Sequence, residues 1–121
     1  LVLFSYFVLT TSSQFPEEKT MQLRYDLIKE ELIRVREELK TKTELELKSL
    51  STNMLTKEYT VFGKNYPLIA WSEEDPDSSI VVIIEMRKKH FLGSFTCYQQ
   101  GFRYKLGECI NLSEEQLWEY D

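Results

Sequence analysis

One stretch constrains the fold of this 121-residue chain more than any other, the run MQLRYDLIKEELIRVREEL at positions 21–39. Its apolar residues recur at alternating intervals of four and three. They are Met21, Tyr25, Ile28, Leu32, Val35 and Leu39. This spacing lines one side of an α-helix, and it is typical both of a coiled-coil seam and of a helix that packs on its own sheet. The first reading predicts a protein that works by pairing, and the second predicts only a folded domain.

The residues after Leu39 favour the second reading. A heptad repeat would place apolar side chains at positions 42 and 46, which are Lys42 and Glu46. A period of 3.6 residues instead keeps Leu50 on the stripe. A second apolar line lies on the side that a coiled coil would expose to water. It consists of Leu23, Leu27 and Leu45. We therefore expect a helix that packs mainly on a sheet, with a long coiled-coil stalk as the alternative.

The length of this helix suggests an interface. No Gly or Pro occurs between positions 17 and 62, so the helix is predicted from about residue 16 to about residue 50. A helix of about 35 residues is roughly 50 Å long, whereas strands of five or six residues reach only about 20 Å. The helix must then extend beyond its sheet. We expect it to meet a protein partner or a second copy of the chain through Tyr25, Leu32, Val35 and Leu39.

The sequence from about residue 58 to about residue 112 is typical of an antiparallel sheet, because turn-forming residues separate β-branched and aromatic runs. Ile80–Ile84 is continuously apolar and predicts a central strand covered on both faces. A charged reversal is predicted at positions 87–90, and a hairpin turn at Gln99–Gly101.

Ser113 and Gln116 then form a capping-box pattern that predicts a short helix at about 113–121. The expected fold class is therefore α+β, with a long N-terminal helix packed on a four- or five-stranded antiparallel sheet and a short C-terminal helix. We expect residues 14–121 to form one domain.

The first residues, LVLFSYFVLT, are apolar and lead into a polar segment that ends near Ser13. This stretch predicts either a buried strand or the remains of a targeting segment. It is too short to span a bilayer, and no transmembrane span is expected. Because the chain begins with Leu1 and ends on Asp121 within a helix-like segment, we expect it to be a piece of a longer protein.

The sequence offers no catalytic or metal-binding motif of recognised spacing. His90 is the one histidine and follows three basic residues in an expected turn. The chain has no C-x-x-C, HExxH, P-loop or GxGxxG pattern. The acidic run at positions 72–79 lacks the glycine and terminal glutamate of a calcium loop. We therefore expect no cofactor and no metal, and a role other than catalysis.

Charge and cysteines bear on partners and compartment. A net charge of −5 argues against nucleic acid as a partner, because phosphate contacts need clustered Lys and Arg. Cys97 and Cys109 could form one disulfide in a secreted domain, or act as small buried hydrophobes. The glycosylation pattern at Asn111 is a single short match. The sequence does not determine the cellular compartment, although an intracellular location is slightly favoured over secretion.

The leading hypothesis is a non-enzymatic protein-interaction or scaffold module. It would use the amphipathic helix and an edge of the sheet, and it could bind a second copy of itself. Two alternatives remain. One is a small secreted inhibitor or ligand-binding domain with a Cys97–Cys109 disulfide. The other is a fragment of a larger enzyme whose site is completed elsewhere.

Overall fold

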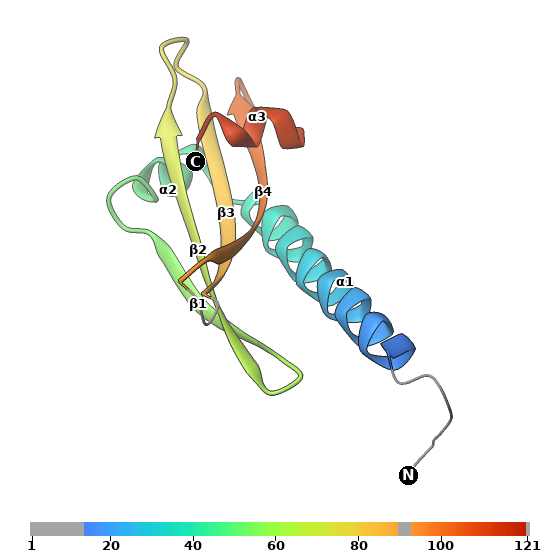
Figure 1. Cartoon of the computed structure of the whole chain (residues 1–121). Helices are drawn as coiled ribbons and strands as arrows, with labels where there is room; N and C mark the ends of the chain where they lie inside the picture. The colour runs from blue at the N-terminus through green and yellow to red at the C-terminus, as the bar shows by residue number, and fades with distance from the viewer. Residues whose placement is uncertain (1–13, 90–92, 121) are drawn as a thin grey trace.

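A five-stranded antiparallel sheet and three helices form the fold in a computed structural model of the chain, which describes residues 14–89 and 93–120 (Figure 1). The elements are α1 (Gln14–Leu39), α2 (Glu44–Ser49), β1 (Leu55–Val61), β2 (Lys64–Glu74), β3 (Ile80–Lys89), β4 (Phe95–Lys105), β5 (Glu108–Asn111) and α3 (Glu114–Trp118). The strands follow chain order across the sheet, and each is antiparallel to the next. The predicted α+β class is confirmed. The apolar stretch at positions 1–10 and His90 lie outside the described residues.

The long helix predicted from about 16 to 50 is two helices in the structure. α1 ends at Leu39, and α2 begins at Glu44. Thr43 explains the new start, because its backbone is extended and its hydroxyl accepts a hydrogen bond from the Glu46 N–H at 3.2 Å. The Glu46 carboxylate accepts one from the Thr43 N–H at 2.9 Å. This capping box fixes where α2 begins, and the prediction of one continuous helix is wrong.

α1 and α2 cover one face of the sheet, where most of the core lies (Figure 1). Side chains from the two helices meet alternate residues of the central strands on this face. The largest fully buried members are Ile28, Leu32, Leu47, Leu68, Ile80, Ile84, Met86 and Phe102. Because these elements are far apart in sequence, this packing fixes the tertiary fold rather than any single element.

α3 covers part of the opposite face. Ser113 caps α3 together with Gln116, as predicted from their spacing. Leu117 packs with Val81 and Ile83 in a second, smaller cluster. β3 therefore has apolar contacts on both sides, and the prediction of a doubly covered central strand at residues 80–84 is confirmed.

Two segments that were predicted to reverse the chain direction belong to strands in the structure. Arg87–Lys88 continue β3, and Gln99–Gly101 lie in the middle of β4. The turn after β4 falls at Leu106 and Gly107, both of which have positive φ. Gly101 is needed for close packing rather than for a turn, because a Cβ there would lie 2.7 Å from the carbonyl oxygen of Val82.

Candidate functional site

The apolar stripe of α1 divides into a buried part and an exposed part. Leu32, Val35 and Leu39 are buried against the sheet, with Leu32 only 1% exposed. Because these three side chains are buried within the domain, little of their surface is left for a partner. Tyr25 is 41% exposed, and Met21, on the same stripe, is 65% exposed. Of the four predicted interface residues, Tyr25 is the most exposed.

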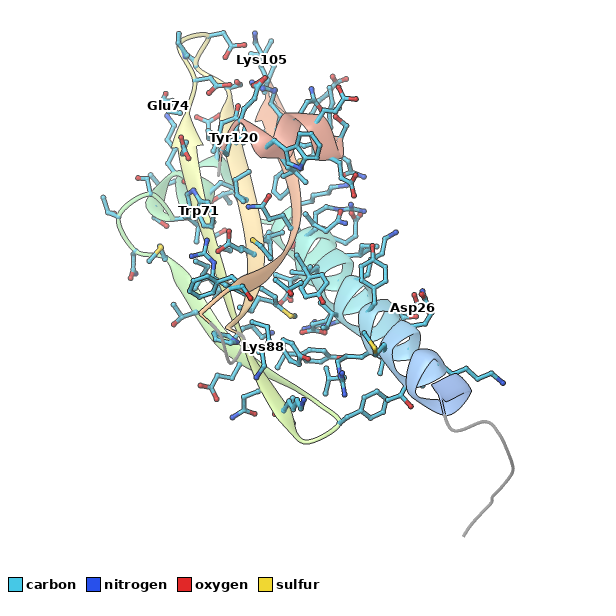
Figure 2. The ribbon with its side chains drawn as sticks, in the orientation of Figure 1. Asp26, Trp71, Glu74, Lys88, Lys105 and Tyr120 are labelled. Atoms are coloured by element: carbon cyan, nitrogen blue, oxygen red, sulfur yellow. The ribbon has the colours of Figure 1, made fainter. Side chains whose placement is uncertain are left out.

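The N-terminal turns of α1 project away from the sheet (Figure 1). Figure 2 shows Asp26 on the side of this helix that faces away from the strands. Arg24 lies on another side, and its guanidinium stacks over the ring of Phe62 at 5.6 Å. The ring of Tyr25 meets that of Tyr98 in β4, with centroids 5.9 Å apart. These two contacts hold the projecting turns in place while Met21 stays exposed.

A groove of about 480 Å³ lies beside β4, between α1 and α3. α1 supplies one wall, the middle of β4 supplies the floor, and the segment from Leu112 through α3 supplies the other wall. The lining residues are Tyr25, Lys29, Leu32, Cys97, Tyr98, Gln99, Gln100, Leu112, Glu114, Leu117 and Trp118. The exposed end of the α1 stripe therefore borders the groove.

The groove follows the edge of β4 because β5 is short. β5 lies beside Phe102–Lys105, the last part of β4. Residues 95–101 of β4 continue past its end. Leu112 leaves the sheet after its N–H donates to the carbonyl oxygen of Gly101 at 3.0 Å. Ser113 then begins α3, which turns across the sheet and forms the second wall.

The two walls of the groove carry opposite charges, and the floor carries none. Lys29 lies on the α1 wall and Glu114 on the α3 wall. Residues 95–101 read FTCYQQG and include no charged side chain. At the inner end, Arg36 Nη1 donates to the side-chain oxygen of Gln100 at 2.6 Å and fixes that amide. Burial raises the pKa of Tyr98, so its phenol stays neutral at physiological pH.

A second hollow, of about 440 Å³, lies on the α3 face of the sheet near Pro67, Ile69 and Phe95. Glu85 is buried there, although it carries a carboxylate. It accepts a hydrogen bond from Gln99 Nε2 at 3.0 Å and pairs with Arg87 at 3.2 Å. Because these partners already engage the carboxylate, this hollow looks like a stabilised part of the sheet rather than a reactive site.

The two cysteines, both within the described residues, are not joined by a disulfide. Cys109 pairs with Tyr104 across the β4–β5 ladder, whereas Cys97 pairs with Arg87 at the other end of β4. Tyr104 and Cys97 are about seven residues apart, which is roughly 23 Å of strand. A disulfide needs Cα atoms within about 7 Å. The predicted pairing is therefore wrong, and the secreted-inhibitor alternative loses its main support.

Within residues 14–89 and 93–120, no group of three or more His, Cys, Asp or Glu side chains is arranged to hold a metal ion. No helix in the same part of the chain is long and apolar enough to cross a membrane.

Sequence reasoning missed several residues of the groove, above all Lys29, Tyr98 and Trp118. Trp118 is exposed, whereas its neighbour Leu117 is buried. One signal was available in the sequence. The run at 95–101 lacks charge in a chain whose residues are 29% charged. A comparison of the chain with protein-family models, curated proteins and solved structures finds no match.

Proposed function

We propose that this chain is a non-enzymatic protein-interaction module. It binds a partner polypeptide through the projecting turns of α1 and the adjoining edge of β4. The observation that supports this proposal is that the apolar stripe of α1 is buried at one end and exposed at the other. Leu32 is 1% exposed and Met21 is 65% exposed, although they share the same side of α1. Covering Met21 and the remainder of Tyr25 would be favourable at about 25 cal/mol per Å² of apolar surface.

The groove beside this stripe favours a polypeptide ligand. Single exposed apolar residues are ordinary on a protein surface. Here, however, Tyr25, which lies on the same stripe as Met21, lines a concave surface whose far wall carries the exposed ring of Trp118. Aromatic side chains, apolar surface and amide groups together are typical of the centre of protein interfaces.

The experiment compares a double variant, Met21→Lys with Tyr25→Lys, with the control Leu45→Lys. Leu45 is an exposed apolar residue on α2, away from the groove. Proteins cross-linked to each tagged chain in cells are quantified by mass spectrometry. We expect the wild type and the Leu45 variant to recover the same partner, and the double variant to recover it at least about tenfold less, a loss of about 1.4 kcal/mol.

Circular dichroism and thermal unfolding must show that the double variant is folded, which we expect because exposed substitutions usually change stability by about 0.5 kcal/mol or less. Equal recovery of partners by the folded double variant and the control would contradict the proposed function.

A further inference from the structure

Arg24, on the projecting turns of α1, differs from the other arginines of the chain. Arg34, Arg36, Arg87 and Arg103 each form a salt bridge with an aspartate or glutamate. Among the residues that the structure describes, Arg24 has no such partner, although the chain carries 20 acidic residues against 15 basic ones. Its positive charge is therefore left without a counter-charge from the described part of the chain.

The sequence of α1 explains why Arg24 is not paired within the helix. Side chains three and four positions apart are neighbours on a helix surface. Those neighbours of Arg24 are all uncharged: Thr20, Met21, Leu27 and Ile28. Arg34, by contrast, lies three residues from Glu31 and four from Glu38, and it pairs with both. The same helix therefore provides counter-charges for one arginine and none for the other.

The guanidinium of Arg24 is half-buried and has an unused donor. It lies over the ring of Phe62, 5.6 Å from the centroid. Such stacking uses the face of the guanidinium and leaves its N–H groups in the plane for a planar acceptor. Its Nε is buried and has no hydrogen-bond partner among the described residues. Because buried donors are almost always paired in native proteins, a ligand with acceptor oxygens would provide what the chain itself lacks.

The surroundings of Arg24 favour a ligand that also has apolar groups. Met21, one helical turn before Arg24, and Phe62 are both exposed. Burial raises the pKa of Tyr98, and the Arg24 guanidinium opposes this effect, so the cation also lies near that phenol. A ligand that covered Met21 and Phe62 would exclude water from a carboxylate bound to Arg24. The ion pair would then be stronger than one on an open surface.

The number of free cations distinguishes the possible anionic ligands. Attraction to an anionic membrane typically uses clusters of about four to eight Lys or Arg side chains, and nucleic acid is held by several phosphate contacts. Arg24 is one half-buried cation on a chain of net charge −5. A guanidinium in this setting matches a single carboxylate, which it can bind through two parallel hydrogen bonds.

Charge also argues against a second copy of the chain as the source of that carboxylate. Two copies that each carry a net charge of −5 repel one another. Arg24 lies beside the β1–β2 hairpin, and the acidic β2–β3 loop lies at the other end of the sheet (Figure 1). In that loop, Asp75 already pairs with Arg103, and Asp77 pairs with Lys105. A contact between these two ends would also be head-to-tail, which leaves an unfilled site on the last copy unless a ring closes.

We propose that Arg24 anchors the partner polypeptide by binding the carboxylate of an aspartate or glutamate side chain. Apolar residues that flank this acidic residue in the partner cover Met21 and Phe62. The guanidinium keeps its stacking on Phe62 and uses its in-plane N–H groups for the carboxylate. This inference rests on the proposed function and specifies the chemistry of the partner.

The test begins with a probe peptide. A displayed library of random peptides is first depleted on the immobilised double variant, Met21→Lys with Tyr25→Lys, and then selected on the wild-type full chain. The surviving peptides therefore depend on the projecting turns of α1. The strongest binder is synthesised, and its affinity is measured by fluorescence anisotropy. We expect it to contain an acidic residue whose replacement by the corresponding amide weakens binding at least about tenfold.

Substitutions in the chain then show whether Arg24 receives that carboxylate. We expect Arg24→Met to bind the acidic peptide at least about tenfold more weakly than the wild type, and to bind the acidic and amide peptides equally. Arg24→Lys keeps the charge but loses the planar fork, so it should retain more affinity than Arg24→Met. Arg34→Met is the matched control on the same helix, because Arg34 is already paired with Glu31, and it should bind within about twofold of wild type. Thermal unfolding checks that each variant is folded.

The outcomes separate this inference from the proposed function. If the selected peptides bind Arg24→Met as tightly as the wild type, or if no peptide distinguishes the wild type from the double variant, the inference is overturned. The proposed function would then still stand if the Met21 and Tyr25 double variant loses its cellular partner. Binding to phosphatidylserine vesicles, or a dimer of the chain alone, that is lost in Arg24→Met but not in Arg34→Met would assign Arg24 to a lipid headgroup or to a second copy, and would also overturn the inference.

Discussion

Among single residues, Glu31 shows how a charge is held at the border of the core. Its side chain is 11% exposed and accepts hydrogen bonds from Arg34 at 2.8 and 2.7 Å, with Lys57 at 3.8 Å. The bond from Arg34 lowers the pKa of Glu31 from its ordinary value of 4.5, against the opposing effect of burial. Since its folded pKa is depressed, Glu31 stabilises the fold above its unfolded-state pKa, and this contribution disappears as the pH falls through the folded pKa.

Replacing the Glu31 carboxylate should therefore lower the free energy of unfolding only at pH values at which the carboxylate is ionised. We expect Glu31→Gln to lower the free energy of unfolding by about 1.5 kcal/mol near pH 7, as for hydrogen bonds to charged groups. The difference from wild type should shrink as the pH falls from about 5 to about 3. Urea unfolding across this range measures it. Glu38→Gln, at a carboxylate that is 57% exposed, should differ little from wild type at either pH. A Glu31→Gln difference that does not change with pH would contradict the expectation.

At the scale of elements, the break between α1 and α2 depends on the cap at Thr43. We expect Thr43→Ala to lower the free energy of unfolding by about 1 kcal/mol, because the Glu46 N–H loses its acceptor. Thr43→Ser keeps the hydroxyl and should stay close to wild type. Chemical denaturation compares the three proteins. If alanine is as stable as serine, the break is held by the burial of Leu47 rather than by the cap.

The break between α1 and α2 also shows that a local sequence pattern is not always sufficient to predict where a helix ends. The spacing of Thr43 and Glu46 is the same signature that correctly predicted α3 from Ser113 and Gln116. Inside a helix, however, a threonine costs only a few tenths of a kcal/mol relative to alanine. A T-x-x-E sequence can therefore either interrupt a helix or lie within one. Packing on the sheet decides between these two outcomes, and this packing cannot be read from the local sequence.

The same reasoning applies to strands and to the groove. Ile80–Ile84 was predicted correctly because a continuously apolar run is itself the signal of a doubly covered strand. The turn predicted at Gln99–Gly101 was wrong because the glycine there makes room for the Val82 carbonyl. The groove depends on where β5 ends and on which face α3 lies. Both are long-range features, so only Tyr25 and Leu32, among the residues that line the groove, could be predicted from the α1 pattern.

For the whole molecule, a polar cluster ties the C-terminal residues to the distant β2–β3 loop. Arg103 in β4 pairs with Asp75 in that loop and donates to Ser79 Oγ at 2.8 Å. The Tyr120 hydroxyl, just after α3, donates to the same Asp75 carboxylate at 3.2 Å. Figure 2 shows Tyr120 at the end of the sheet that carries Lys105. The cluster therefore holds α3 in position across the sheet, and α3 is one wall of the groove.

Removing the centre of this cluster should loosen the wall without touching the groove. Arg103 is half-buried and makes several bonds, so we expect Arg103→Met to lower the free energy of unfolding by about 1.5–3 kcal/mol. Lys105→Met is the matched control, because its pair with Asp77 is exposed and should contribute less than about 1 kcal/mol.

The effect should also be local to α3. The amide of Leu117, which donates to the Ser113 carbonyl, should exchange with solvent faster in Arg103→Met than in Lys105→Met. Equal exchange at Leu117 in the two variants would show that the second apolar cluster alone fixes α3. The position of this wall of the groove would then depend on the packing of α3 against β3 rather than on the polar cluster.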